Sequence, residues 1–168
     1  NNLICSGTNT KTLGDANDSI RITGNFSIDS GSTVTTTRPW LFSGNWTNLG
    51  TFTATAQTIT FLGNAQNINA GLNNSFFNNV SFTTGGPKTF VTNGADINGT
   101  FGITGVTVDM GTLSHNIGGS VTNTGGTWTT TNARLAFDGA AQVITSPTTL
   151  LAKSVILAGT AAKTMGQD

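Results

Sequence analysis

The 168-residue chain contains no glutamate and no tyrosine, and it has one cysteine and one histidine. Its acidic residues are seven aspartates, balanced by seven basic residues, and charged residues make up 8% of the chain against a usual share of ~25%. So few and scattered basic residues form no patch that would neutralise phosphates, which excludes nucleic acid as an expected partner. No apolar run approaches the ~20 residues that cross a bilayer, so we expect no membrane span.

The single cysteine, Cys5, cannot form an internal disulfide. We interpret it as a small buried hydrophobe near the first strand, in preference to a lipid-modified or intermolecular cysteine. The single histidine, His115, lies in the turn-like segment 113–116 and is expected to face solvent, not to act as a ligand or base. The chain begins at Asn1 without methionine or signal peptide, which indicates a mature product or a piece of a longer polypeptide.

Threonine, asparagine and glycine are abundant instead, with 33, 19 and 22 residues. Helix formers are scarce and β-branched residues are common, so the local preference is for strands and turns. Disordered chains combine high net charge with few large apolar residues. This chain has zero net charge, ten phenylalanines and three tryptophans, and we therefore expect it to fold around an apolar core.

An internal repeat organises the sequence. The stretch 44–55 recurs in altered form as 119–130, and Ala65-Gln66 recurs as Ala141-Gln142. Lys88-Thr89-Phe90 recurs as Lys163-Thr164-Met165. We predict a single domain over 1–168, with repeat units of about 11–87 and 88–162 and a third unit beginning at 163.

A shorter period of about 20 residues runs inside each unit. It is marked by a glycine that precedes a large or branched apolar residue, as at Gly24, Gly44 and Gly63, and at Gly99, Gly119 and Gly139. Four coils of about 19 residues would make one unit. This spacing predicts an all-β fold, a right-handed parallel β-solenoid of about 19–20 residues per coil, with the handedness taken from the crossover rule. Tandem β-sandwiches are the alternative, for which 75 residues per domain is short.

Alternation of apolar and polar residues predicts short strands and no helix longer than a turn. Ile20, Ile22, Phe26 and Ile28 face one way in a strand over 20–28. Further strands are predicted at 46–48, 50–55, 58–62, 79–83, 95–103, 106–110, 120–122, 126–131, 134–137 and 154–157. The residues expected to stack in the core are Ile22, Phe26, Trp46, Phe52, Ile59, Phe61, Val80 and Phe82.

The two end coils of a solenoid need a cap that covers their open backbone groups. Asparagine and threonine ladders can satisfy the corners between coils, but an uncapped end exposes open backbone groups. The segment 164–168 offers no charged or helical cap. We therefore expect that the chain continues into a longer repeat array or that one molecule docks end to end on the next.

The sequence segments that recur with this period are similar to those of a known class of proteins. They are Gly44-Asn45-Trp46-Thr47-Asn48, Gly50-Thr51-Phe52-Thr53, Thr58-Ile59-Thr60-Phe61, Ala65-Gln66-Asn67-Ile68 and Phe77-Asn78-Asn79-Val80-Ser81-Phe82. They resemble the units of exported bacterial β-strand-repeat surface proteins, large adhesin-like and filament-like polypeptides. The resemblance covers most of residues 20–165, implies an extracellular structural or adhesive role, and carries over no catalytic residue.

Enzymatic chemistry has little support in the sequence. A β-helix lyase or glycosidase needs paired carboxylates, and none of the aspartates recurs between the units. They are Asp15, Asp18, Asp29, Asp96, Asp109, Asp138 and Asp168. The segment 14–18 offers oxygens to calcium, but the full calcium-binding nonapeptide repeat is absent. We predict no enzyme activity, no catalytic residue, no cofactor and no metal.

Threonine arrays of the form Thr-x-Thr raise the option of a flat hydroxyl face that binds ice or glycan. They lie at Thr33/Thr35/Thr37, Thr51/Thr53/Thr55 and Thr127/Thr129/Thr131. Ice binding needs them in register on adjacent coils, and the coil around 73–77 interrupts them, so strand propensity is the preferred explanation.

The function that the sequence favours is structural. We expect a β-solenoid segment of an extracellular cell-surface fibre, filament or adhesin that assembles by stacking coils end to end, with glycan as a further contact. A polysaccharide-binding module is second, favoured if Trp40 or other aromatics line a groove. A polysaccharide-cleaving β-helix enzyme is third, favoured by a cleft with two carboxylates.

Overall fold

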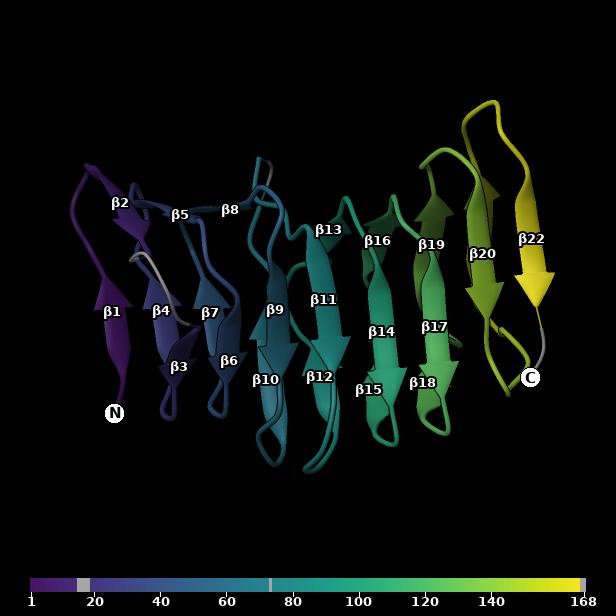
Figure 1. Ribbon diagram of the computed structural model, residues 1–168, viewed down its shortest axis with the longest axis horizontal. Coiled ribbons are helices and arrows are strands. Elements are labelled where there is room, and N and C mark those ends of the chain that lie inside the picture. Colours follow the sequence, from purple (N-terminus) through teal and green to yellow (C-terminus); the bar gives the residue numbers. More distant parts are fainter. Residues whose placement is uncertain (15–18, 73, 167–168) are drawn as a thin grey trace.

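The computed structural model describes residues 1–14, 19–72 and 74–166, and the described residues contain strands and turns but no helix. The strands run parallel and stack into a solenoid whose axis is horizontal in Figure 1, from β1 to β22. Each coil visits three faces in turn. The first face is a seven-stranded sheet of β1 (Leu3–Cys5), β4 (Phe26–Ile28), β7 (Trp46–Asn48), β10 (Gln66–Asn69), β12 (Lys88–Phe90), β15 (Thr107–Asp109) and β18 (Thr127–Thr129).

The second face consists of two sheets, and we call it the split face. It contains β2 (Thr10–Leu13), β5 (Thr33–Thr36) and β8 (Thr51–Ala54), followed by β13 (Asp96–Ile97), β16 (Ser114–Ile117), β19 (Arg134–Phe137) and β21 (Ser154–Leu157). Between the two sheets the face narrows to Phe76 and Phe77, which form isolated bridges to Thr53 and Ile97.

The third face is an eight-stranded sheet. It is built from β3 (Ile20–Ile22), β6 (Trp40–Phe42), β9 (Thr58–Phe61), β11 (Asn79–Phe82), β14 (Phe101–Thr104), β17 (Val121–Thr124), β20 (Gln142–Thr145) and β22 (Lys163–Gly166).

The register between coils confirms the parallel β-solenoid and excludes tandem sandwiches. The shortest coil takes 18 residues, from Thr33 to its partner Thr51, and the longest takes 23, from Leu3 to Phe26. Many coils take 20, as from Phe26 to Trp46. The predicted 19–20 residues per coil are therefore close to the observed lengths, while the handedness stays a prediction.

The core follows from the alternation along each strand. All eight side chains predicted to stack inside are at most 5% exposed: Ile22, Phe26, Trp46, Phe52, Ile59, Phe61, Val80 and Phe82. Their outward neighbours are polar except for the half-buried Leu62, so each coil has one buried apolar lining and one largely hydrated surface. A fully buried side chain of this size contributes roughly 1.5–3 kcal/mol, and it does so only when the coils on both sides cover it.

The predicted strand over 20–28 is wrong in one respect. The structure divides it into β3 and β4, which belong to different sheets and meet at a corner around Gly24. The predicted strand over 95–103 is divided in the same way into β13 and β14 at Gly99. Inward side chains flank each corner on both sides, so a single alternating pattern continues through the bend.

The 75-residue repeat does not correspond to a whole number of coils, so the expectation of four coils per unit is wrong. The segment 44–55 supplies β7 to the seven-stranded sheet, whereas its copy 119–130 supplies β17 to the eight-stranded sheet. With the Phe76–Phe77 bridge counted as one position, β17 comes eleven strand positions after β7. Equivalent residues of the two units therefore lie on different faces.

The glycine corners of the first unit recur in the second unit, but between a different pair of faces. In the first unit, Gly44 lies against the carbonyl group of Gly24, between the eight-stranded and seven-stranded sheets. In the second, Gly119 lies against Gly99, between the split face and the eight-stranded sheet. A Cβ atom at either position would overlap the backbone below it, so close stacking of the corners requires glycine.

Buried polar side chains close the same corners from inside. The amide nitrogen of Gln66 donates to the carbonyls of Phe42 and Gly44 in the coil before it. Its copy, Gln142, donates to Ile117 O at 2.8 Å and Gly119 O at 2.7 Å.

A lysine follows one coil later. Lys88 Nζ donates to Gly63 O at 2.8 Å, Thr84 O at 3.2 Å and Gly86 O. Lys163 Nζ donates to Gly139 O at 2.7 Å and Ala140 O at 2.9 Å. Backbone carbonyls at each corner thus receive donors from a side chain that recurs with the 75-residue period.

Candidate functional site

The solenoid is irregular where the split face narrows. After β10 ends at Asn69, the chain makes a loop through Gly71 and Ser75 before it returns to the face at Phe76 and Phe77. The loop stands in the place of a regular strand. It leaves a hollow of about 250 Å³ beside the edge of β13.

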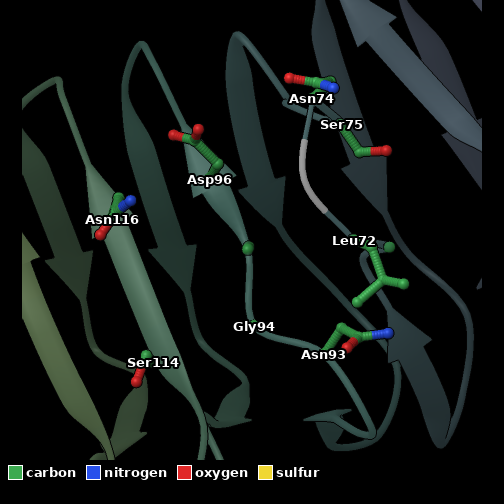
Figure 2. A pocket seen from close by; sticks show the side chains of 10 residues that line it. Leu72, Asn74, Ser75, Asn93, Gly94, Asp96, Ser114 and Asn116 are labelled. Atoms are coloured by element: carbon green, nitrogen blue, oxygen red, sulfur yellow. The ribbon is translucent and has the colours of Figure 1, made fainter.

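Polar side chains line this hollow. The lining is made of Gly71, Leu72, Asn74, Ser75, Asn93, Gly94, Ala95, Asp96, Ser114 and Asn116. Figure 2 shows Asp96 and Asn116 on neighbouring strands, Asn74 and Ser75 on the other side of Asp96, and Asn93 beside Leu72. We call the cavity lined by these ten residues the polar hollow. Amides, hydroxyls and one carboxylate provide both donors and acceptors around a single opening.

A second layer of contacts holds the lining in place. The amide nitrogen of Asn93 donates to Oδ1 of the buried Asn69 at 3.0 Å. Asn48, which is fully buried, donates from Nδ2 to Ser75 Oγ at 3.0 Å and to Ala70 O at 3.1 Å. The loop and the turn before β13 are therefore fixed by side chains from the solenoid interior.

Two backbone positions at the polar hollow have unusual dihedrals. Asn74 and Thr92, which precedes Asn93, both have φ of 68°. This left-handed region is uncommon for residues other than glycine and is unfavourable for a β-branched residue such as threonine. Such positions persist where surrounding contacts enforce them, and they concentrate at binding and catalytic sites.

Among the described lining residues, Asp96 alone carries a charge. Partial burial raises the pKa of its carboxyl group, and the negative charge of Asp138 adds to the rise. Register places Asp96 beside Asn116, and Asn116 beside Ala136, so Asp138 lies two coils away, about 10 Å along the axis. The two carboxylates influence each other's charge but are too far apart to share a proton.

His115 is not a solvent-facing turn residue, so that prediction is wrong. It is 1% exposed on β16 and points into the core between Ser114 and Asn116. Its Nδ1 accepts from the Ala95 amide at 3.0 Å and its Nε2 donates to Met110 O at 2.9 Å. Burial lowers the pKa of His115 to about 4, against an opposing effect of the hydrogen bond to Met110. The neutral ring thus fixes the backbone beneath the polar hollow.

The other residues considered from sequence are dispersed. Cys5 is buried as predicted, and burial raises the pKa of its thiol, with the charge of Lys11 opposing the rise. Asp109 accepts from the Gly111 amide at 2.9 Å in a turn. Asp15, Asp18, Asp168 and most of the candidate calcium segment 14–18 lie outside the described residues. Within the described part of the chain, no three His, Cys, Asp or Glu residues group in a way that would hold a metal ion.

The threonine arrays are in register over part of the split face. Thr33 and Thr35 of β5 pair with Thr51 and Thr53 of β8, and β2 adds a third rank below them. The loop after β10 ends the series, as expected from the interruption around 73–77. Thr127 and Thr129 belong to the seven-stranded sheet, so the third array lies on a different face.

Aromatic residues do not line an external groove. Trp40, whose exposure would favour a polysaccharide-binding module, is fully buried against Phe26 and Phe52. Phe76 is the one phenylalanine or tryptophan that is not fully buried. A binding platform that stacks aromatic rings on sugars is therefore not formed.

The coil of β21 and β22 differs from those before it in exposure. Val155 and Leu157 of β21 are 44% and 58% exposed, whereas their register partners Leu135 and Phe137 are 1% and 0% exposed. Met165 of β22 is 58% exposed and its partner Ile144 is 1% exposed. Apolar positions that point inward elsewhere are uncovered here, beside two strands that, among the described residues, are each paired along one edge only.

The polar hollow was not predicted from the sequence. In the sequence, Asp96 is one of seven dispersed aspartates, and the coil around 73–77 is only a break in the threonine arrays. The register between coils is the information that would have predicted the hollow. Asn93 and Asp96 are close in sequence, but their position beside Asn116 follows only from the length of the coil between β13 and β16.

No helix among the described residues is both long enough and apolar enough to cross a membrane. Comparison with protein-family models, with curated proteins and with solved structures gives no significant match. The resemblance of the repeats to bacterial surface proteins therefore stays a prediction.

Proposed function

We propose that this protein is a structural β-solenoid segment of an extracellular fibre, filament or adhesin, and that further coils stack on its end. The observation that carries the proposal is the exposed apolar coil of β21 and β22. Val155, Leu157 and Met165 occupy core positions and lack the cover that their partners receive from the next coil. A further coil, from a second copy or from a longer chain, would restore it.

The unpaired strand edges support the same proposal. β21 and β22 stand at the ends of their sheets, each paired on one side. Open edges beside exposed apolar residues are a ready template for another strand. A docking coil would gain backbone hydrogen bonds from the edges and apolar burial from the core positions, as each coil does inside the solenoid.

The proposal includes the absence of catalysis. Groups suited to acid–base chemistry are used inside the fold: His115 and Lys88 are buried and bonded to backbone groups. Asp96 and Asp138 are two coils apart, which exceeds the separation at which paired carboxylates of glycosidases act together.

End-to-end stacking is tested by changing the exposed coil. We expect the purified 168-residue chain to form particles that grow in length at constant width as concentration rises, seen by light scattering and electron microscopy. The variant Leu157→Lys should remain monomeric, because an ammonium group would be buried at the junction. The matched control is Val143→Lys, which changes a 48% exposed valine on the lateral surface and should assemble normally.

Two results would contradict the stacking proposal. One is a wild-type particle that stays monomeric at every concentration. The other is assembly that Val143→Lys abolishes and Leu157→Lys leaves intact, which would show lateral association.

The extracellular location is a separate part of the proposal, supported by the resemblance of the repeats. Antibodies raised against the folded chain should label intact cells of the source organism without permeabilisation. Labelling that requires permeabilisation would refute the location and leave the stacking proposal standing.

A further inference from the structure

We propose that the polar hollow binds one sugar residue, free or as part of a glycan, by hydrogen bonds to Asp96, Asn93 and Asn116. The proposal does not depend on end-to-end assembly. It also differs from an aromatic platform, since the tryptophans are buried and the lining offers hydrogen-bonding groups instead.

The charge of the lining selects the class of ligand. Asp96 is negative, and the described lining contains no lysine or arginine, so phosphate and other anions are disfavoured. One carboxylate with neutral amides and hydroxyls is too weakly charged for a dedicated divalent-cation site. A neutral ligand with many donors remains, and a carboxylate oxygen accepts strong hydrogen bonds from hydroxyl groups.

The size of the hollow fits a single ring. Its volume of about 250 Å³ lies just below the ~300–1,000 Å³ of drug-sized sites. Donors and acceptors surround the opening on three sides, from β13, β16 and the loop before Phe76 (Figure 2). Leu72, which is 67% exposed at the rim, offers an apolar contact to the C–H face of a ring.

The supporting contacts make the lining rigid before a ligand arrives. The side-chain nitrogen of Asn93 donates a hydrogen bond to Asn69, which leaves the side-chain oxygen Oδ1 of Asn93 available as an acceptor. Asn48 and His115 hold the loop and the Ala95 backbone from inside. A site whose side chains are already positioned loses less conformational entropy on binding, which favours recognition of a small ligand.

A second hollow lies at the corresponding loop of the second unit. It follows β20, where a loop again replaces a strand, and Ser146 bonds to Asn123 as Ser75 bonds to Asn48. Its lining includes Ile144, Leu150 and Met165 and no charged residue among those described. The loop and its serine–asparagine contact therefore recur with the repeat.

The test is ligand-observed saturation-transfer NMR with millimolar glucose, galactose, mannose and N-acetylglucosamine, followed by oligosaccharides of any sugar that responds. We expect transfer to at least one monosaccharide. Asp96→Asn, which preserves shape, should weaken binding about tenfold or more, because it replaces a charged acceptor by a neutral one. Asn116→Phe should abolish binding by filling the opening. Stronger binding of an oligosaccharide than of its monosaccharide would identify a glycan as the ligand.

Controls separate the site from general effects. Asp29→Asn removes an exposed carboxylate remote from the hollow and should bind as the wild type does. Since Asp96 and Asn116 face outward, Asp96→Asn and Asn116→Phe should both keep the wild-type melting temperature. The proposal is overturned if no sugar shows transfer, if Asp96→Asn and Asn116→Phe bind as tightly as the wild type, or if calcium alone titrates the site and sugar binding requires it.

Discussion

Buried polar side chains satisfy the backbone groups that the solenoid corners leave open. Lys88 is the clearest example, since it is fully buried and its ammonium group contacts three carbonyl oxygens without a carboxylate among its hydrogen-bond partners. Burial lowers the pKa of this group. Such an arrangement stabilises the corner only while every donor is used.

We predict that Lys88→Met destabilises the fold by about 2–4 kcal/mol, because the carbonyls of Gly63, Thr84 and Gly86 would lose their donor inside the protein. The repeat supplies the control. Lys163→Met removes the equivalent lysine at the half-buried last coil and should cost less than ~1 kcal/mol. Urea denaturation followed by circular dichroism measures both, and equal losses would show that burial does not set the effect.

His115 makes stability depend on pH. Its pKa is about 4 in the folded state, below the ordinary value of 6.5, so the unfolded chain binds the proton more readily. The contribution of the neutral His115 ring to the free energy of unfolding is therefore fully present above pH 6.5. It is lost as pH drops from 6.5 to 4, by about 3 kcal/mol in total.

The variant His115→Leu checks this dependence. Leucine is the residue found at the paired position in the next coil, Leu135. The variant should be less stable at pH 7, because Ala95 N and Met110 O lose their partner, and its unfolding midpoint should change little between pH 6.5 and 5. A wild-type slope that persists in the variant would show that His115 does not cause the pH dependence.

At the scale of strands, the sequence predicts many of those with apolar residues facing inward, but it misses β6, whose inward residues are Trp40 and Phe42. β7, β19 and β21 have the predicted bounds. β10 and β16 were not predicted, because Gln66 and His115 occupy core positions and break the alternation. Corners were also hidden, since Gly24 and Gly99 interrupt strands without interrupting the pattern. The polar hollow depends on coil length and loop path, which no local pattern specifies.

Corner glycines should tolerate no side chain. Gly44→Ala and Gly119→Ala are each expected to cost about 3 kcal/mol or more, because the new Cβ would overlap backbone atoms of Gly24 or Gly99. Gly102→Ala is the control, since a Cβ in the middle of β14 meets its nearest atom, Val80 O, at 3.7 Å. It should be neutral or slightly stabilising. Thermal unfolding of the three variants tests this, and a Gly102→Ala loss as large as the others would refute the steric explanation.

For the whole molecule, stability should vary along the axis. Each coil contacts only its neighbours, so local opening depends on the packing on either side. Aromatic side chains from Phe26 to Phe90 form one continuous series of ring contacts, whereas β21 and β22 have exposed core positions. The coils around β4 to β11 should therefore be the most protected.

Hydrogen exchange measured by mass spectrometry checks this gradient. We expect the slowest exchange in peptides from β4 to β11 and the fastest in β21 and β22. If the protein assembles end to end, exchange in β21 and β22 should slow at high concentration. Uniform exchange along the chain would show that the solenoid opens as a single cooperative unit.

The eleven-position offset between the repeats has a consequence for how such a chain grows. A duplicated segment must add a whole number of strand-and-corner steps, but it need not complete a turn, because any face accepts any strand that keeps its inward residues. Each added unit is then related to the last by a screw operation of a third of a turn. A longer array would present the features that recur between units, such as the loop after β10 and its copy after β20, in three directions around its axis.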